Sequence, residues 1–172
     1  MTLSLRPAQA RDIDAVGAMH YASRLAAYRD FVPLDGLRAM SAESLTAWWR
    51  ERFRYESDTH RLTIALAGDR PVGFTYVGPD EDDDRVAQLY AIHLDPAEQG
   101  QGYGRALMRD ALAAMRAAGW REAVLWVLAG NGHARRFYER GGWAPDGAER
   151  EELVGAAPTR QLRYRRWLGE SA

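Results

Sequence analysis

Three glycines at alternate positions, Gly100, Gly102 and Gly104, mark the stretch of the sequence best suited to binding an anion. They follow Val86 to Leu94, a run dense in apolar and aromatic residues, and they open a segment reaching Gly119 whose apolar residues recur at helical spacing. Glycine lets a backbone approach a ligand closely, and a helix start offers unpaired N–H groups and positive dipole character. This order of strand, glycine loop and helix predicts a binding site for a phosphate group.

Three kinds of phosphate loop can be compared with this spacing. A P-loop requires a lysine, and the sequence contains no lysine. A dinucleotide-binding loop requires two residues between its second and third glycines, whereas only Tyr103 separates Gly102 from Gly104. The third pattern, Gln/Arg-x-x-Gly-x-Gly/Ala, is met by Gln99, Gly102 and Gly104. In this respect the segment resembles the pyrophosphate loop of GNAT-family N-acetyltransferases.

A second segment resembles another signature of the same family, Asn-x-x-Ala-x-x-Phe-Tyr-x-x-x-Gly-Phe. Its places are held in register, with tryptophan for the usual last phenylalanine, by Asn131, Ala134, Phe137, Tyr138, Gly142 and Trp143. The opening residues Leu5 to Ala8 and the residues Arg70 to Phe74 are also similar to those of family members. Together the matches cover most of the chain, and two motifs at the expected separation form a more specific signal than either motif alone.

The resemblance implies direct transfer of an acetyl group from acetyl-coenzyme A to a primary amine within a ternary complex. It implies that backbone N–H groups from Gly100 to Arg105 bind the pyrophosphate. The main chain of the preceding strand end would pair with the pantetheine arm and polarise the thioester carbonyl. The cofactor-binding residues expected in this way are Ile92, His93, Leu94, Gln99, Gly100, Gln101, Gly102, Tyr103, Gly104, Arg105, Asn131 and Tyr138.

Tyr138 is the expected general acid, which would protonate the departing coenzyme A thiolate. Its reference pKa of about 10, against about 8.5 for a thiol, keeps it protonated at neutral pH yet able to donate within a hydrogen bond. Asn131 would orient the cofactor arm. A simpler interpretation stays open for both, because an aromatic pair such as Phe137 and Tyr138 commonly packs in a core and an asparagine commonly caps a helix.

The general base is less clearly indicated. Some family members carry a glutamate five residues before the motif asparagine, but Trp126 holds that position here. His93 lies on the strand beside the expected acetyl site and has a suitable pKa, and His20 is an equivalent candidate. A chain of water molecules is the alternative. His60 and His133 are expected at the surface, and the spacing of the four histidines does not suggest a metal site.

The acceptor pocket is expected to be aromatic. Its candidate walls are Tyr28, Trp48, Trp49 and Tyr90, whose spacing equally suits burial in a core. The acidic run from Glu81 to Asp84 could attract a cationic amine or could simply be a solvated loop. The acceptor is therefore a small-molecule or peptide amine whose class stays open among amino acids, polyamines, aminoglycosides, peptide N-termini and protein lysines.

Composition narrows the functional classes. The 172 residues fit a single acetyltransferase domain spanning 1–172, and a net charge of −1 gives no basic field for nucleic acid. The absence of cysteine excludes an acyl-cysteine intermediate and cysteine metal ligands. No apolar run approaches the length of a membrane span, and the N-terminus does not resemble a signal peptide, so the expected location is the cytoplasm, without membrane attachment.

Hydrophobic periodicity predicts one α/β unit of about seven strands and about four helices. The expected strands are residues 2–6, 61–67, 72–78, 86–94, 122–129, 148–154 and 159–167, the last two separated by Gly155 and Pro158. The expected helices are residues 11–28, 41–53, 104–119 and 131–140. The resemblance implies a mixed, mostly antiparallel sheet that splays between its fourth and fifth strands, with coenzyme A in the cleft.

Other interpretations remain open at this level. A non-catalytic module that binds acyl-coenzyme A would keep the loop without the chemistry, and a structural protein would carry both motifs by chance. The apolar residues of the last strand, Leu162, Tyr164 and Trp167, fit either a homodimer interface or completion of the monomer core.

Overall fold

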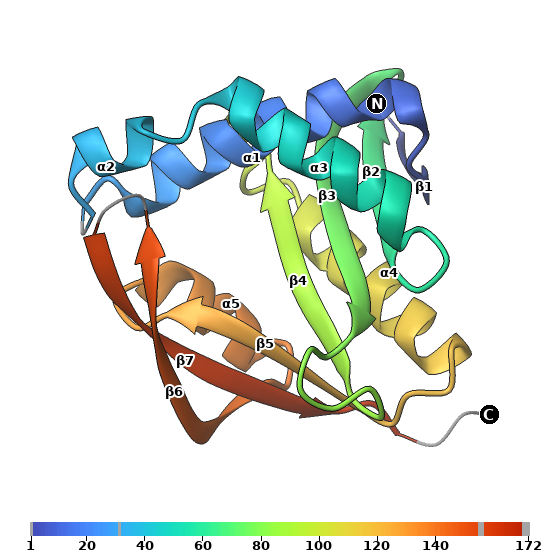
Figure 1. The fold of residues 1–172 in the computed structure, drawn as a ribbon. Coiled ribbons are helices and arrows are strands. Elements are labelled where there is room, and N and C mark those ends of the chain that lie inside the picture. Colours follow the sequence, from blue (N-terminus) through green and yellow to red (C-terminus); the bar gives the residue numbers. More distant parts are fainter. Residues whose placement is uncertain (1, 31, 155–156, 170–172) are drawn as a thin grey trace.

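One mixed sheet of seven strands organises the computed structural model, which describes residues 2–30, 32–154 and 157–169 (Figure 1). The strand order is β1-β2-β3-β4-β5-β7-β6, and β4–β5 is the parallel pair while the other neighbours are antiparallel. The strands are β1 (Leu3–Pro7), β2 (Arg61–Ala67), β3 (Arg70–Pro79), β4 (Ala87–Leu94), β5 (Glu122–Leu128), β6 (Ala144–Val154) and β7 (Ala157–Trp167). The predicted α/β class and mostly antiparallel sheet are therefore confirmed.

Helices cover both faces of this sheet. They are α1 (Ile13–Tyr28), α2 (Leu34–Arg38), α3 (Ala42–Glu56), α4 (Tyr103–Ala117) and α5 (Gly132–Arg140). One apolar cluster joins α1 and α3 to β2, β3 and β4. A second cluster joins α4 to β4, β5 and β7, with α5 packed against it (Figure 1). The sheet therefore lies between one helical layer formed by α1 and α3 and another formed by α4 and α5.

The sheet opens between β4 and β5. These strands pair only at Ala87 with Ala123 and at Gln88 with Val124, and then diverge (Figure 1). Beyond Gln88, β4 stays paired with β3 on its other side, across an irregularity that leaves Tyr90 between the paired residues Leu89 and Ala91. The splay that the family resemblance implied is present at the predicted place.

Several element boundaries differ from the sequence predictions. The short helix α2 was not predicted, because five residues are too few to show a helical period. The structure begins β6 at Ala144 rather than Ala148, since an edge strand tolerates the missing N–H of Pro145 and a register shift before Glu149. Pro158 lies inside β7, opposite Leu153, and Gly155 lies outside the described residues.

The last strand completes the monomer core. In the described chain β7 lies between β5 and β6, so β6 rather than β7 forms the edge of the sheet. Tyr164 is fully buried and Leu162 packs against the same cluster, whereas Trp167 is 57 % exposed. Of the two interpretations of these residues, the structure supports core packing for Leu162 and Tyr164.

A close approach of α1 and α3 fixes the helical layer on one face of the sheet. Gly17 of α1 faces Thr46 of α3, and a Cβ added at Gly17 would lie 2.7 Å from the Thr46 Cα atom. The substitution Gly17→Ala is therefore expected to lower the free energy of unfolding by about 1–3 kcal/mol, because overpacking outweighs the gain in helix propensity. Chemical denaturation measures the loss. The exposed neighbour Ala18→Gly gives the propensity term alone, and a stabilised Gly17→Ala protein would contradict the packing argument.

Candidate active site

The glycine loop has the geometry of an anion cradle. Gly100 and Gly102 have φ angles of +82° and +81°, and a Cβ added at either would meet no atom within 4 Å. Gly102 caps α4, and its carbonyl accepts the N–H of Ala106 at 3.2 Å. The N–H groups of Tyr103, Gly104 and Arg105 therefore precede the first hydrogen bond of the helix and are free of intrahelical partners. This arrangement provides donors and positive dipole character on an open face.

An ion pair and a hydrogen bond to the Glu98 side chain fix the conformation of the glycine loop. The Glu98 side chain is 9 % exposed and accepts hydrogen bonds from Arg70 at the start of β3 and from the Gln101 amide, the latter at 3.0 Å. The amide group of Gln101 is thus bound to Glu98, although Gln101, like Gln99 and Arg105, is an exposed residue. Among the predicted loop residues, Gln101 is left to contact a cofactor through its backbone.

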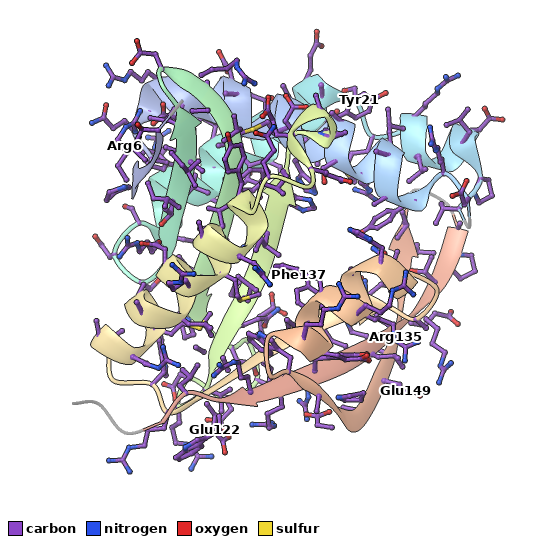
Figure 2. The ribbon with its side chains drawn as sticks, turned by 180° about the vertical axis from the view of Figure 1, so that it is seen from behind. Arg6, Tyr21, Glu122, Arg135, Phe137 and Glu149 are labelled. Carbon is purple, nitrogen blue, oxygen red and sulfur yellow. The ribbon has the colours of Figure 1, made fainter. Side chains whose placement is uncertain are left out.

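Helices α4 and α5 approach each other next to this loop. Phe137 of α5 lies between the two helices in Figure 2. A Cβ added at Gly104 would lie 3.6 Å from Phe137 and 3.6 Å from Leu94, so the strand end, the loop helix and α5 meet there. The two sequence motifs, separated along the chain, are therefore brought together.

Tyr138 follows Phe137 on α5 and is half-buried. Its ring lies 6.3 Å from that of Tyr164 and 6.4 Å from that of Trp143. Burial raises the pKa of Tyr138, and the neighbouring Tyr28 on α1 raises it further. Tyr138 thus packs against the core while its hydroxyl stays protonated through the neutral range.

Asn131 caps α5, as the simpler interpretation required. Its Oδ1 atom accepts the N–H of Ala134 at 3.1 Å. The cap consumes the carbonyl end of the side chain, and the amide end is the part that a cofactor could contact.

A cavity of about 400 Å³ opens on the other side of β4, facing α1 and α3. The four predicted aromatic walls, Tyr28, Trp48, Trp49 and Tyr90, all line it. Trp49 is 1 % exposed and belongs to the core as well, whereas Trp48 is 43 % exposed. Trp49 is therefore both a core residue and a wall of the cavity, whereas Trp48 lines the cavity without being buried in the core.

Two histidines face each other in the wall of this cavity. The rings of His20 and His93 lie 4.6 Å apart, His20 Nδ1 accepts the Trp49 indole N–H at 3.0 Å, and His93 Nδ1 is 2.9 Å from Ser23 Oγ. Burial lowers the pKa of His93 to about 4, with a further contribution from the Arg24 charge. Burial, His93 and Arg24 lower the pKa of His20 to about 2. Both rings are therefore neutral at neutral pH.

These pKa values predict acid sensitivity. In the unfolded chain histidine binds a proton below about pH 6.5, whereas His93 in the folded protein binds one only near the lower value, so stability falls as the pH decreases between them. Each histidine contributes a slope of up to about 1.4 kcal/mol per pH unit. The variant His20→Gln/His93→Gln is expected to flatten the dependence of unfolding free energy on pH, measured by urea denaturation. His133→Gln, on the exposed side of α5, is the control, and an unchanged slope in the double variant would contradict the assignment.

Sequence reasoning missed most of the charged residues of the cavity. Arg24, Arg52, Arg150 and Glu152 line it together with the acidic-loop residue Glu81. The Arg52 guanidinium lies 4.2 Å from the Trp48 ring centre, and that of Arg150 lies 4.3 Å from the ring centre of Trp126. Arg24 could have been identified from the helical period, because it stands four residues from both His20 and Tyr28 and therefore lies on the same face of α1 as these two candidates.

His60 was wrongly expected at the surface. It is half-buried, and its ring stacks on Tyr76 with centres 5.2 Å apart. His133 is exposed, as predicted. The acidic run is mainly a local loop, since Asp83 pairs with Arg85 at 2.8 Å and Asp80 accepts from the N–H groups of the next turn.

The β4 strand separates the two sides of the site. Ile92 packs toward α4, where the glycine loop begins, whereas His93 lines the cavity and contacts Ser23 of α1. On the side facing β5, the main chain beyond Gln88 has no strand partner in the described chain. A ligand held by the loop and a second ligand held in the cavity can therefore meet at this exposed strand edge.

Metal-ligand clusters and membrane-spanning helices are absent from the described residues. Within residues 2–30, 32–154 and 157–169, no three histidine or acidic side chains are grouped as metal ligands would be. None of the helices in that part of the chain combines the length and apolar character needed to span a membrane.

Comparison with known proteins gives a consistent result. The model of the "Acetyltransferase (GNAT) family" matches residues 25–143. A mycothiol acetyltransferase of Geodermatophilus obscurus is 40 % identical over 84 residues, which are 46 % of this chain but only 27 % of that protein. A probable N-acetyltransferase of Mycobacterium tuberculosis is 28 % identical over 84 % of this chain and 82 % of its own. The crystal structure of the PaiA N-acetyltransferase from Thermoplasma acidophilum, in complex with coenzyme A, superposes with a TM-score of 0.78 at 18 % identity, covering 97 % of this chain and 99 % of its own.

Proposed function

Because this chain belongs to the GNAT acetyltransferase family, we propose that it transfers an acetyl group from acetyl-coenzyme A directly to a primary amine in a ternary complex. The observation that carries the proposal is the open edge of β4, with a phosphate cradle at its end and a separate cavity on its other side. Two ligands can reach one strand edge from opposite faces, as direct transfer requires.

The cofactor would be held by the glycine loop. The left-handed glycines leave space where side chains would otherwise stand, and the N–H groups at the start of α4 are available to a pyrophosphate. Each charge-assisted hydrogen bond contributes about 1.5–3 kcal/mol before ordering costs. The amide end of Asn131 would orient the arm of the cofactor.

Acetyl-coenzyme A, when bound, supplies the thioester. Main-chain N–H groups among Ile92, His93 and Leu94 would donate to the thioester carbonyl oxygen, where negative charge develops during attack by the amine. Such a donor typically contributes about 2.7–4 kcal/mol of transition-state stabilisation. Tyr138 would then protonate the sulfur as the carbon–sulfur bond breaks.

The hydrogen bonds in the cavity favour His93 over His20 as proton acceptor from the amine. Because His20 Nδ1 already accepts from Trp49, the neutral ring carries its proton on Nε2 and has no lone pair left to use. His93 can donate from Nδ1 to Ser23 Oγ, which leaves its Nε2 lone pair unprotonated. In that tautomer His93 would accept the proton from the attacking nitrogen as the carbon–nitrogen bond forms, directly or through water.

The test measures acetyl-coenzyme A binding by calorimetry and then thiol release with a panel of amines that covers the five acceptor classes. Binding with turnover of at least one amine supports the proposal. Binding without turnover of any of them would instead indicate a non-catalytic module, and no binding would remove the cofactor assignment. The mycothiol acetyltransferases do not decide the acceptor, since this chain spans only 27 % of the relative compared above.

A further inference from the structure

The acceptor cavity holds one half-buried cation without an acidic partner in the described chain. Arg24 lines the cavity from α1, and its Nε atom is buried without a hydrogen-bond partner. Across the described residues, its guanidinium makes one hydrogen bond, from Nη1 to the Met40 Sδ atom at 3.2 Å. Sulfur is a weak acceptor, so most of the hydrogen-bonding capacity of this guanidinium is unused.

The other arginines of the cavity are compensated. Arg52 pairs with Glu56 at 3.1 Å and lies over Trp48. Arg150 donates to Gln161 at 2.7 Å, lies 3.6 Å from Glu152 and covers Trp126. In the described parts of the chain, no carboxylate lies within ion-pair distance of Arg24.

A half-buried guanidinium with a buried, unpartnered Nε atom lowers the stability of the protein. Removing a charge from water is unfavourable, and an unmade hydrogen bond leaves that cost uncompensated. Burial accordingly lowers the pKa of Arg24. A ligand that brings a carboxylate into the cavity would recover this free energy, because the planar fork of arginine matches the two oxygens of a carboxylate.

We infer that Arg24 binds a carboxylate of the acceptor, so that the amine substrate is an amino acid or a similarly small amino carboxylic acid. The inference rests on the proposed acetyl transfer and specifies its acceptor. Arg24 stands one helical turn after His20 on α1, the His20 ring lies 4.6 Å from that of His93 on β4, and all three residues line the cavity, so the guanidinium is near the β4 edge where the amine must react. The carboxylate and the amine are therefore only a few atoms apart. Polyamines and aminoglycosides have no carboxylate, and in a peptide N-terminus or a protein lysine an amide carbonyl stands in its place.

The experiment compares matched substrates on the unaltered protein. Each of several amino acids is assayed beside its primary amide and its decarboxylated amine, for example phenylalanine beside phenylalaninamide and phenethylamine. We expect kcat/KM for the acid to exceed that of the other two by at least about tenfold, the equivalent of one charge-assisted hydrogen bond. Equal rates for the three compounds would overturn the inference and leave the proposed function intact. Turnover of another amine class but of none of these compounds would overturn the inference alone, whereas binding of acetyl-coenzyme A without turnover of these compounds or of any amine in the five-class panel would overturn both.

A variant then assigns the preference to its residue. Arg24→Met keeps the length of the side chain and is expected to raise KM for the acid by about tenfold, with kcat and the affinity for acetyl-coenzyme A nearly unchanged. Rates with the amide and the amine are expected to change little. Arg24→Lys keeps the charge but not the planar fork of the guanidinium, so its KM for the acid should lie between those of the unaltered protein and Arg24→Met. Arg29→Met, at the exposed end of α1, is the control, and an equal loss on all three substrates in Arg24→Met would contradict carboxylate binding.

Discussion

Replacement of Tyr138 by phenylalanine is expected to lower kcat by at least about 100-fold and to leave the dissociation constant for acetyl-coenzyme A almost unchanged. The ring packs against Trp143 and Tyr164, and phenylalanine preserves that packing. Only the hydroxyl proton is lost. Burial raises the pKa of Tyr138, so the proton is retained until a strong base appears beside it. A thiolate formed in the same poorly solvated place is such a base, since burial disfavours its charged form as well.

The measurements are steady-state kinetics with the best amine and calorimetric titration with acetyl-coenzyme A. Tyr164→Phe is the matched control, because it removes a hydroxyl that bonds to Arg135 and Glu139 in the same aromatic cluster. That variant should lose stability but retain its rate per folded molecule. If Tyr138→Phe turned over as fast as the unaltered protein, Tyr138 would be a packing residue only.

Substitution of Gly102 by aspartate is expected to raise the dissociation constant for coenzyme A by at least about 100-fold. Aspartate is among the residues that best tolerate a positive φ, and the space around this Cβ position is open, so the fold should persist. The added carboxylate would lie where the loop is expected to hold the pyrophosphate. At an effective dielectric constant of about 20, two like charges about 5 Å apart repel by about 3 kcal/mol.

Two companions separate charge from backbone strain in this test. Gly102→Asn has a similar shape without the charge, so its loss of affinity should be smaller. Gly147→Asp adds the same residue at a φ of +89°, also in open space, but on β6. Gly147→Asp should cost similar stability and leave coenzyme A affinity unchanged. Similar affinity losses in the two aspartate variants would remove the glycine loop from the cofactor site.

The sequence predicted those features whose cause is local. A glycine loop, a cap at Asn131 and a continuous apolar run in β5 each depend on a few adjacent residues, so their positions could be inferred without knowing the fold, whereas the left-handed conformation of Gly100 and Gly102 is a result of the structure. The resemblance of the two motifs supplied the splay of the sheet, which no single segment encodes. Loop, strand end and α5 were thus expected to meet, and Phe137 contacts the region of Gly104.

Features that arise between distant segments were not predictable in this way. His60 is half-buried because its ring stacks on Tyr76 of β3. Tyr76 is distant from His60 in the sequence, so the residues next to His60 do not predict this contact. The lining of the acceptor cavity likewise comes from more than four elements. Arg24 on α1 and Glu152 on β6 are far apart in the sequence, so their shared position in the cavity could be recognised only from the structure. The candidate base became distinguishable from its neighbour only through the contacts of Ser23 and Trp49.

The order of the last two strands in the sheet affects how the protein can fold during translation. In the described chain β6 pairs with β7 alone, although β6 precedes it along the chain. While a ribosome is still making Ala157–Trp167, β5 has an unpaired edge and β6 has no strand to join. The half of the sheet that contains α5 can therefore close only after translation of β7, whereas β1 to β4 can assemble earlier. Until β7 has been synthesised, the nascent chain carries an open β-edge, and such an edge can pair with other chains and lead to aggregation.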